Sequence, residues 1–255
     1  MRIRVQNLRG EFGMGELFLG RMRLIICVAI VLFASGCATT GAIDERDPIE
    51  GFNRSMYSFN QGMDKFIFDP VSKFYQAITP DFVERGITNF FNNIDDISII
   101  ANDILQFKIG QAYMDSARFI FNSTLGLAGF RDVSSQMGLE KHDEDFGQTL
   151  AVWGVGPGPY IVTPFFGPTT LRDATSLIVD DVLLNPVAYL NNNDELKAGL
   201  LTLNYIDIKA SLLTANDLVN EAALDQYEFT KNAYFNKRES LINDGRLAPL
   251  PDFEE

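Results

Sequence analysis

The sequence predicts an all-α fold in a single domain, on three observations. Apolar residues recur at steps of three and four over most of residues 47–245, which is the period of one helix face. Proline and glycine separate these stretches, as they do between helices. Only residues 160–166 (YIVTPFF) have the composition of a strand, and Pro164 within them argues against one. The 255 residues, 46% hydrophobic, suffice for one sizeable core.

The amino-terminal 36 residues have the plan of a secretory signal peptide. Arg21 and Arg23 precede an apolar run of about 11 residues, against the roughly 20 that a membrane-crossing helix needs. The stretch before Met22 is polar, so Met22 is the expected true start. The signal ends in FASGC, which places small residues directly before Cys37 and resembles a bacterial lipobox.

That resemblance implies cleavage before Cys37 and acylation of its sulfur, such as a diacylglycerol with palmitate chains. Ala34 stands where leucine is commoner, and the alternative is an ordinary signal peptide with a chance cysteine. Several acyl chains would anchor the protein firmly, since each buried CH₂ contributes about 0.8 kcal/mol. Residue 38 is Ala rather than Asp, which by resemblance implies the outer membrane.

The helices are expected to follow a short tether, residues 37–46. Asp47 is the expected cap of the first helix, 48–68, and Glu50 would complete a capping box. Asp95 and Asp96 are expected to open a new helix. The tail, 246–255, is expected to be flexible. The other helices are predicted at about 70–78, 80–94, 95–105, 111–125, 144–153, 170–183, 194–213 and 216–243.

Phenylalanines are concentrated in the first half of the chain, where twelve of the 21 lie between residues 52 and 130. Several form adjacent or off-register pairs, so their rings point to more than one face of a helix. A helix that is apolar all round is buried in a core or in lipid. Both interpretations are open, and the lipid anchor favours partial immersion in one leaflet. The expected membrane-facing residues are Phe52, Phe59, Phe66, Phe90 and Phe91.

The net charge of −13 restricts the partners of this protein. Nucleic-acid binders need basic surface, so no nucleic acid is expected. Electrostatic attraction to anionic lipid is excluded for the same reason. Membrane affinity must therefore come from apolar surface or from a covalent lipid.

Catalytic and metal-binding patterns are weak. His142 is the single histidine and lies in a charged segment that is expected to be exposed, whereas zinc sites need several His or Cys ligands. A triad of Ser134, His142 and Asp145 can be imagined, but no motif marks these residues. The pairs Asp95/Asp96 and Asp180/Asp181 are interpreted as helix caps or solvated charge. No nucleotide motif is found. We therefore expect no enzyme, no metal and no cofactor.

Residues 153–168 (WGVGPGPYIVTPFFGP) are rich in both glycine and proline. Glycine permits unusual backbone angles and proline fixes its own, so the segment predicts a defined bend with hinges. One interpretation is a packed connection between helices. The other is a hairpin that dips into a membrane or gates a passage. The gating residues would be Gly154, Gly156, Pro157, Gly158, Pro159 and Tyr160.

Four blocks of the sequence resemble the MlaA/VacJ family of outer-membrane lipoproteins, in the same order over nearly the whole mature chain. They are DPIEGFNRSMYSFN (47–60), FNSTLGLAGFRDV (121–133), the stretch from FGQTL to TTLRD (146–173) and NAYFNKRESLINDG (232–245).

The resemblance implies a ring-like helical protein, embedded in the periplasmic leaflet of the outer membrane, with a central polar channel. It further implies association with a trimeric porin and transfer of misplaced phospholipid to a soluble periplasmic lipid carrier, which maintains lipid asymmetry. Arg172 and Asp173 would lie at the channel mouth, or alternatively start a helix. The rival functions are a structural or adhesive lipoprotein that docks a partner through aromatic surface, and a lipid-cleaving enzyme.

Overall fold

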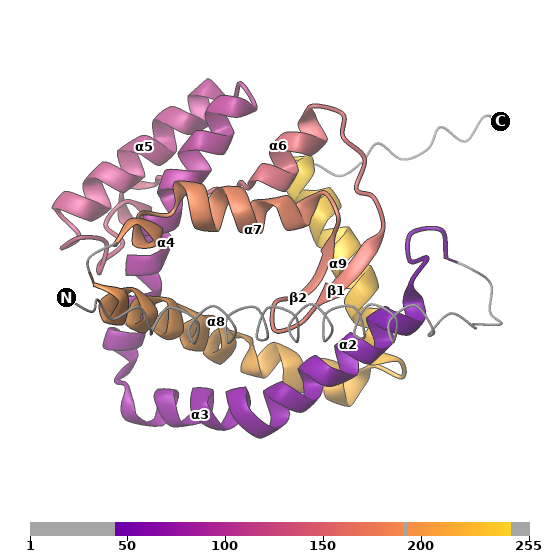
Figure 1. Ribbon diagram of the computed structural model, residues 1–255. Coiled ribbons are helices and arrows are strands. Elements are labelled where there is room, and N and C mark those ends of the chain that lie inside the picture. The colour runs from indigo at the N-terminus through magenta and orange to yellow at the C-terminus, as the bar shows by residue number, and fades with distance from the viewer. Residues whose placement is uncertain (1–43, 191–192, 246–255) are drawn as a thin grey trace, which may run out of the picture.

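The computed structural model describes residues 44–190 and 193–245. The predicted signal peptide, Met22, Cys37, most of the tether and the tail 246–255 lie outside the described residues. Figure 1 shows the described elements arranged in a ring, with the β-hairpin on its inner side. The predicted ring-like helical fold is confirmed.

The helices lie around this ring, and the chain doubles back after the hairpin so that α8 lies beside α3 (Figure 1). A continuous helical stretch comprises α2 (Glu50–Met63), the π-helical turn η1 (Asp64–Phe68) and α3 (Asp69–Ile78). The paired helices α4 (Asp81–Leu105) and α5 (Ile109–Thr124) come next. The remaining elements are η2 (Ser135–Met137), α6 (Phe146–Val152), η3 (Asp173–Thr175), α7 (Ser176–Ile178), η4 (Val179–Leu184), η5 (Pro186–Tyr189), α8 (Asp194–Ala222) and α9 (Gln226–Ile242).

A two-stranded antiparallel hairpin joins α6 to η3. Strand β1 (Tyr160–Thr163) pairs with β2 (Gly167–Thr170), and Thr163 lies opposite Gly167. The prediction that Pro164 prevents a strand was therefore wrong, because β1 ends one residue before it. Phe165 in the turn and Gly167 at the start of β2 both have positive φ, which glycine adopts readily.

Two predicted helix starts are corrected. Ile49, and not Asp47, occupies the N-cap of α2, and no side chain caps this helix. The Asp47 carboxylate instead accepts a hydrogen bond from the Asn53 side chain. Asp95 and Asp96 open no helix, because α4 runs unbroken through them and Asp96 is buried.

The interior of the ring wall is polar. Among the described residues, twenty polar or charged side chains are buried, against ten hydrophobic ones. An apolar cluster forms from Tyr160, Val162 and Tyr227, where the hairpin packs between α2 and α9. This reverses the usual distribution, in which charged side chains are almost never fully buried unless paired.

Helix α3 shows the reversal clearly. Ser72 and Tyr75 are its buried residues, and the Tyr75 hydroxyl donates a hydrogen bond to Asp207 of α8 at 2.8 Å. Phe74 and Ile78 are 64% and 62% exposed. The apolar side of this helix therefore faces away from the protein. Within the described ranges, no helix is long and apolar enough to cross a membrane.

Candidate functional site

The hairpin is fastened to α2 by a buried asparagine. The Asn53 amide donates to the carbonyl of Tyr160 at 2.9 Å and accepts from the backbone N–H of Val162 at 2.9 Å. The same side chain donates to Asp47 at 2.7 Å. Asn53 therefore satisfies backbone groups that would otherwise be buried without partners.

A second asparagine holds the turn of the hairpin. Asn60 lies seven residues after Asn53, so both occupy the same side of α2. Its amide donates to the Thr163 carbonyl and accepts from the Phe165 N–H, each at 2.9 Å. The Tyr205 hydroxyl of α8 donates to the Phe165 carbonyl at 2.9 Å. The hairpin is thus fixed at both ends.

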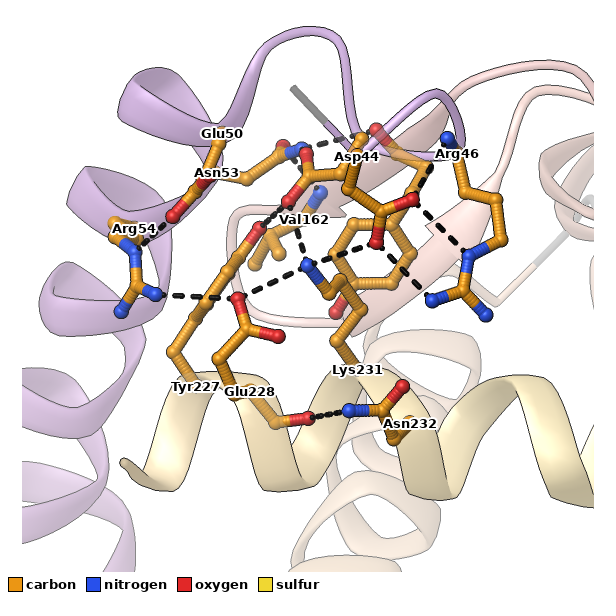
Figure 2. Close-up of polar contacts among 12 residues, drawn as sticks. Asp44, Arg46, Glu50, Asn53, Arg54, Val162, Tyr227, Glu228, Lys231 and Asn232 are labelled. Atoms are coloured by element: carbon orange, nitrogen blue, oxygen red, sulfur yellow. Dashed lines mark hydrogen bonds and ion pairs between the residues drawn. The ribbon is translucent and has the colours of Figure 1, made fainter. Parts of the chain in front are cut away.

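A cluster of charged groups closes the ring between the start of the described chain and α9. We call it the closing clasp: Asp44, Asp47, Tyr227, Glu228 and Lys231. The Lys231 ammonium is 1% exposed and lies 3.3 Å from Asp44, 3.4 Å from Asp47 and 2.9 Å from Glu228 (Figure 2). Burial alone would lower the pKa of Lys231, but these carboxylates outweigh it and raise the pKa. The ammonium is therefore held in its charged form.

The predicted gating residues fall into two groups. Residues 152–158 are exposed, and Gly154 and Gly158 have φ of +88° and +67°. Tyr160, in contrast, is fully buried beside Tyr227 and Tyr234. The bend at 154–158 is therefore at the surface, whereas the strands after it are bonded to α2. Gating by this segment stays a prediction.

Arg172 and Asp173 form a buried ion pair, with Nε and Oδ1 at 2.8 Å. Asp173 also accepts from the Tyr234 hydroxyl at 2.6 Å and from Arg238 at 3.1 Å, both on α9. Burial would raise the pKa of Asp173, but the bonds from Arg172 and Tyr234 keep it below its ordinary value. Asp173 is the first residue of η3, so the helix-start interpretation fits its place. The pair joins α9 to the segment after the hairpin, and its place at a channel mouth stays a prediction.

A cavity of about 560 Å³ lies under the hairpin turn. Its wall comes from α2, η1, the turn, α8 and α9. The charged residues of the wall are Asp64, Lys65, Asp69 and Lys209. The Lys209 ammonium pairs with Asp64 at 2.5 Å and lies over the rings of Phe68 and Tyr205. Sequence reasoning did not find this site, although the adjacent charges of Asp64 and Lys65 inside the apolar stretch 48–68 were a signal for it.

Buried carboxyl groups lie between α4 and α5. Asp103 and Asp115 are both fully buried, and neither oxygen of Asp103 has a hydrogen-bond partner in the described chain. Burial, with the neighbouring charges of Asp115 and Glu144, raises the pKa of Asp103 to about 8. A carboxyl group with this pKa keeps its proton at neutral pH.

Nearby acidic residues behave similarly. Burial raises the pKa of Asp96 and Asp180 to about 6 in each case. Asp180 accepts from the N–H of Phe146, the first residue of α6, and from Asn102 of α4, both at 2.8 Å, so this half-buried carboxylate bonds to two other helices rather than to water alone. No group of three or more potential ligands among the described residues could hold a metal ion.

The imagined triad is not assembled. His142 is about one-third exposed, and its Nδ1 lies 2.7 Å from Asp115, so the expectation of an exposed histidine was wrong. Ser134 donates to the Arg118 carbonyl at 3.2 Å. Asp145 caps α6 through the Gln148 N–H and pairs with Arg238. The three side chains therefore have separate partners.

The five predicted membrane-facing phenylalanines differ in exposure. Phe66 is 77% exposed and Phe59 is 42% exposed, while Phe52 and Phe90 are half-buried. Phe91 is 6% exposed, so its assignment to the outer face was wrong. It points into the wall, where its ring packs edge-on against Phe90. Further exposed apolar side chains in this half of the chain are Ile67, Val71, Phe82, Ile104, Phe107, Ile109, Tyr113 and Ile120.

The sequence of the ring matches a known family. A family model described as MlaA lipoprotein covers residues 45–241. The chain belongs to this family.

Relatives in the family are similar over most of their length. An "Intermembrane phospholipid transport system lipoprotein MlaA" of Shigella flexneri is 34% identical over 220 residues, covering 84% of this chain and 86% of that protein. The protein of the same description from Escherichia coli K12 is 33% identical over 222 residues, with the same coverage.

The fold of the MlaA family is also found in a solved structure. A chain described under "Structural basis for maintenance of bacterial outer membrane lipid asymmetry" superposes with a TM-score of 0.68 at 31% identity. The match covers 77% of this chain and 99% of that one. The similarity extends over the whole of that chain, so the ring is shared as a unit.

Proposed function

We propose that this protein is an outer-membrane lipoprotein that passes misplaced phospholipid from the outer leaflet towards the periplasm and so maintains lipid asymmetry. The MlaA-named relatives, described as parts of an intermembrane phospholipid transport system, support this function. The ring would sit in the periplasmic leaflet, anchored by lipid on Cys37.

The observation that carries the proposal is the reversed distribution of polarity. Helices α4 and α5 bury Asp96, Asp103, Asp115 and Arg118, while aromatic and branched aliphatic side chains cover their exposed sides. Such a surface is costly in water and favourable against acyl chains. Backbone groups facing lipid need partners within the protein, and helices supply them.

A passage lined by polar groups suits a lipid headgroup, and the cavity under the hairpin turn carries such groups in Asp64, Lys65, Asp69 and Lys209. Moving a polar headgroup through hydrocarbon is costly because its hydrogen-bond partners in water are lost. A ring one leaflet deep replaces those partners with its own polar groups. With no nucleotide motif in the sequence, the protein acts as a passive conduit. Direction then comes from a soluble periplasmic lipid carrier, and a trimeric porin is the proposed membrane partner.

A transfer assay tests the proposed function. Purified protein is reconstituted in vesicles with labelled phospholipid, and transfer to a soluble acceptor is measured. We expect transfer that depends on the protein and needs no nucleotide. A protein that binds vesicles but moves no lipid would favour the alternative, a structural or adhesive lipoprotein that docks a partner.

The gating role of the bend gives a more specific test. Gly154 needs a positive φ, so substitutions there strain the backbone whatever its function. Gly156 has no other atom within 4 Å of the place that a Cβ would take, so Gly156→Ala removes flexibility without a clash. We expect slower lipid transfer with an unchanged melting temperature. Wild-type transfer by Gly156→Ala would exclude gating at this hinge.

A further inference from the structure

The cavity under the hairpin turn has the size and composition of a ligand site. Its volume of about 560 Å³ is within the range of small-molecule pockets, roughly 300–1,000 Å³. Phe165, Phe166 and Leu212 supply apolar wall, and Asn216 and Asn220 supply amides. An apolar wall combined with polar groups suits a molecule that is itself amphiphilic.

The charges of the cavity are balanced. Two carboxylates, Asp64 and Asp69, face two ammonium groups, Lys65 and Lys209. Only one ion pair forms among them in the described structure, Asp64 with Lys209. One carboxylate and one ammonium group therefore remain available to a ligand.

The π-helical turn explains why Lys65 and Asp69 form no ion pair with each other. Lys65 and Asp69 are four residues apart, a spacing that pairs opposite charges on an α-helix. They lie across η1, where hydrogen bonds reach one residue further and the side chains shift around the axis. The Lys65 ammonium lies 5.8 Å from the centre of the Phe66 ring, and the described chain contains no ion pair between Lys65 and Asp69. Single π-helical turns occur frequently at functional sites.

We infer that this cavity binds the headgroup of a zwitterionic phospholipid, an inference that rests on the proposed function. The Asp69 carboxylate receives the cationic end of the headgroup, and Lys65 and Lys209 hold the phosphate. Phe165 and Phe166 of the turn contact the start of the acyl chains. The hairpin turn is thus a wall of the lipid site, held in place by Asn60 and Tyr205.

Charge balance is the source of the selectivity. A zwitterion matches both signs, whereas an anionic headgroup places unpaired negative charge beside Asp64 and Asp69. Discrimination of this kind works partly by repulsion of the wrong ligand. The protein therefore retains zwitterionic lipid in preference to anionic lipid.

Lipid retention tests the inference. The protein is incubated with vesicles of equimolar phosphatidylethanolamine, phosphatidylcholine and phosphatidylglycerol, purified again, and its bound lipid is quantified by mass spectrometry. We expect zwitterionic lipid to exceed phosphatidylglycerol by roughly fivefold to tenfold, the scale of one charge-assisted contact. An excess of phosphatidylethanolamine or of phosphatidylcholine over phosphatidylglycerol supports the inference. Equal retention of all three, or an excess of phosphatidylglycerol, would overturn it.

Substitutions test whether the preference for zwitterionic headgroups arises in this cavity. Asp69→Asn leaves the cavity with a net positive charge, so the ratio should move towards phosphatidylglycerol. Lys65→Gln leaves it net negative, so phosphatidylglycerol should fall further. Lys73→Gln and Asp81→Asn are matched controls on exposed positions outside the cavity wall, and they should retain the wild-type ratio. If Asp69→Asn and Lys65→Gln leave the ratio unchanged at wild-type melting temperature, the headgroup site is not in this cavity.

This experiment separates the two levels of the proposal. Lipid retained without a headgroup preference contradicts the headgroup site and leaves phospholipid transfer standing. No lipid retained and no transfer to an acceptor contradict the proposed function itself.

Discussion

Asn53 makes three contacts with one buried amide, and these contacts determine where the hairpin lies. It pairs with the Tyr160 carbonyl, the Val162 N–H and Asp47, and its own side chain is fully buried. An asparagine on the apolar helix 48–68 was visible in the sequence. Its hairpin partners were not, since they lie more than 100 residues away and no local pattern specifies them.

Replacing this amide should destabilise the ring. Asn53→Ala leaves the Tyr160 carbonyl and the Val162 N–H buried without partners, and each such group costs about 1–3 kcal/mol. We expect a loss of about 2–4 kcal/mol in the free energy of unfolding, measured by denaturant titration. Asn232→Ala is the control, because that exposed amide only donates to a carbonyl of its own helix. Its loss should stay below about 0.5 kcal/mol.

The buried acid Asp103 should make stability depend on pH. Its pKa is about 8 in the folded protein and near the ordinary value of 3.8 in the unfolded chain. The folded state therefore binds more protons between these values, and stability falls as pH rises through this range. Asp103→Asn removes this dependence at one site. Its melting temperature should exceed that of the wild type by an amount that grows from about pH 4 to pH 8.

Other buried acids should keep part of the pH dependence of stability in the Asp103→Asn variant. Asp96 and Asp180 also have raised pKa values and act in the same direction up to about pH 6. The gain from Asp103→Asn should therefore be clearest between about pH 6 and pH 8. A constant difference across the whole range would show that Asp103 does not hold a proton in the folded state.

At the scale of elements, helices α3, α4 and α5 are amphipathic with their apolar sides outward. Apolar periodicity predicted most helices of this fold, because the period of about 3.6 residues is the same whichever way the apolar side faces. For that reason the periodicity did not show whether the apolar side of a helix faces a protein core or lipid. Phe91 shows the limit, since neighbouring Phe90 and Phe91 look alike in sequence and only one is buried.

The exposed side of α3 should control membrane binding. Phe74 is 64% exposed and lies on the same side as Ile78. Burying a phenylalanine in an apolar phase contributes about 1.5–3 kcal/mol. Phe74→Gln should therefore weaken partition of the unacylated protein into vesicles by about tenfold, measured by sedimentation. Phe74→Leu is the control, and it should partition nearly as the wild type. If both variants keep the wild-type partition, α3 does not contact the bilayer.

At the scale of the whole molecule, the closing clasp joins residues 44–47 to α9, and the buried Lys231 ammonium lies among three of its carboxylates. Arg46 and Arg54 pair with Asp44 and Glu228 at the edge of the clasp. The sequence predicted residues 37–46 as a tether, but the structure shows that Asp44 and Arg46 already contact the folded ring. A lysine buried among three carboxylates has no signature in local sequence.

Removing this cation should open the joint. Lys231→Met leaves Asp47 buried without its counter-charge, and breaking a buried pair in this way costs about 3–5 kcal/mol. We expect faster hydrogen exchange over residues 44–54 and over α9, measured by mass spectrometry. Lys237→Met is the control on the exposed side of the same helix. Adding Asp47→Asn to Lys231→Met should restore part of the protection, because it removes the unpaired charge.

The clasp also has a consequence for biosynthesis. Asp47 and Lys231 are 184 residues apart, and chains are made amino terminus first. Residues 44–54 must therefore wait for their partners on α9 until nearly the whole polypeptide has emerged. Contacts of such long sequence separation form slowly. A chain that ends before α9 lacks Lys231 and Tyr227, so it leaves Asp47 without its counter-charge and the hairpin without its apolar contact to α9.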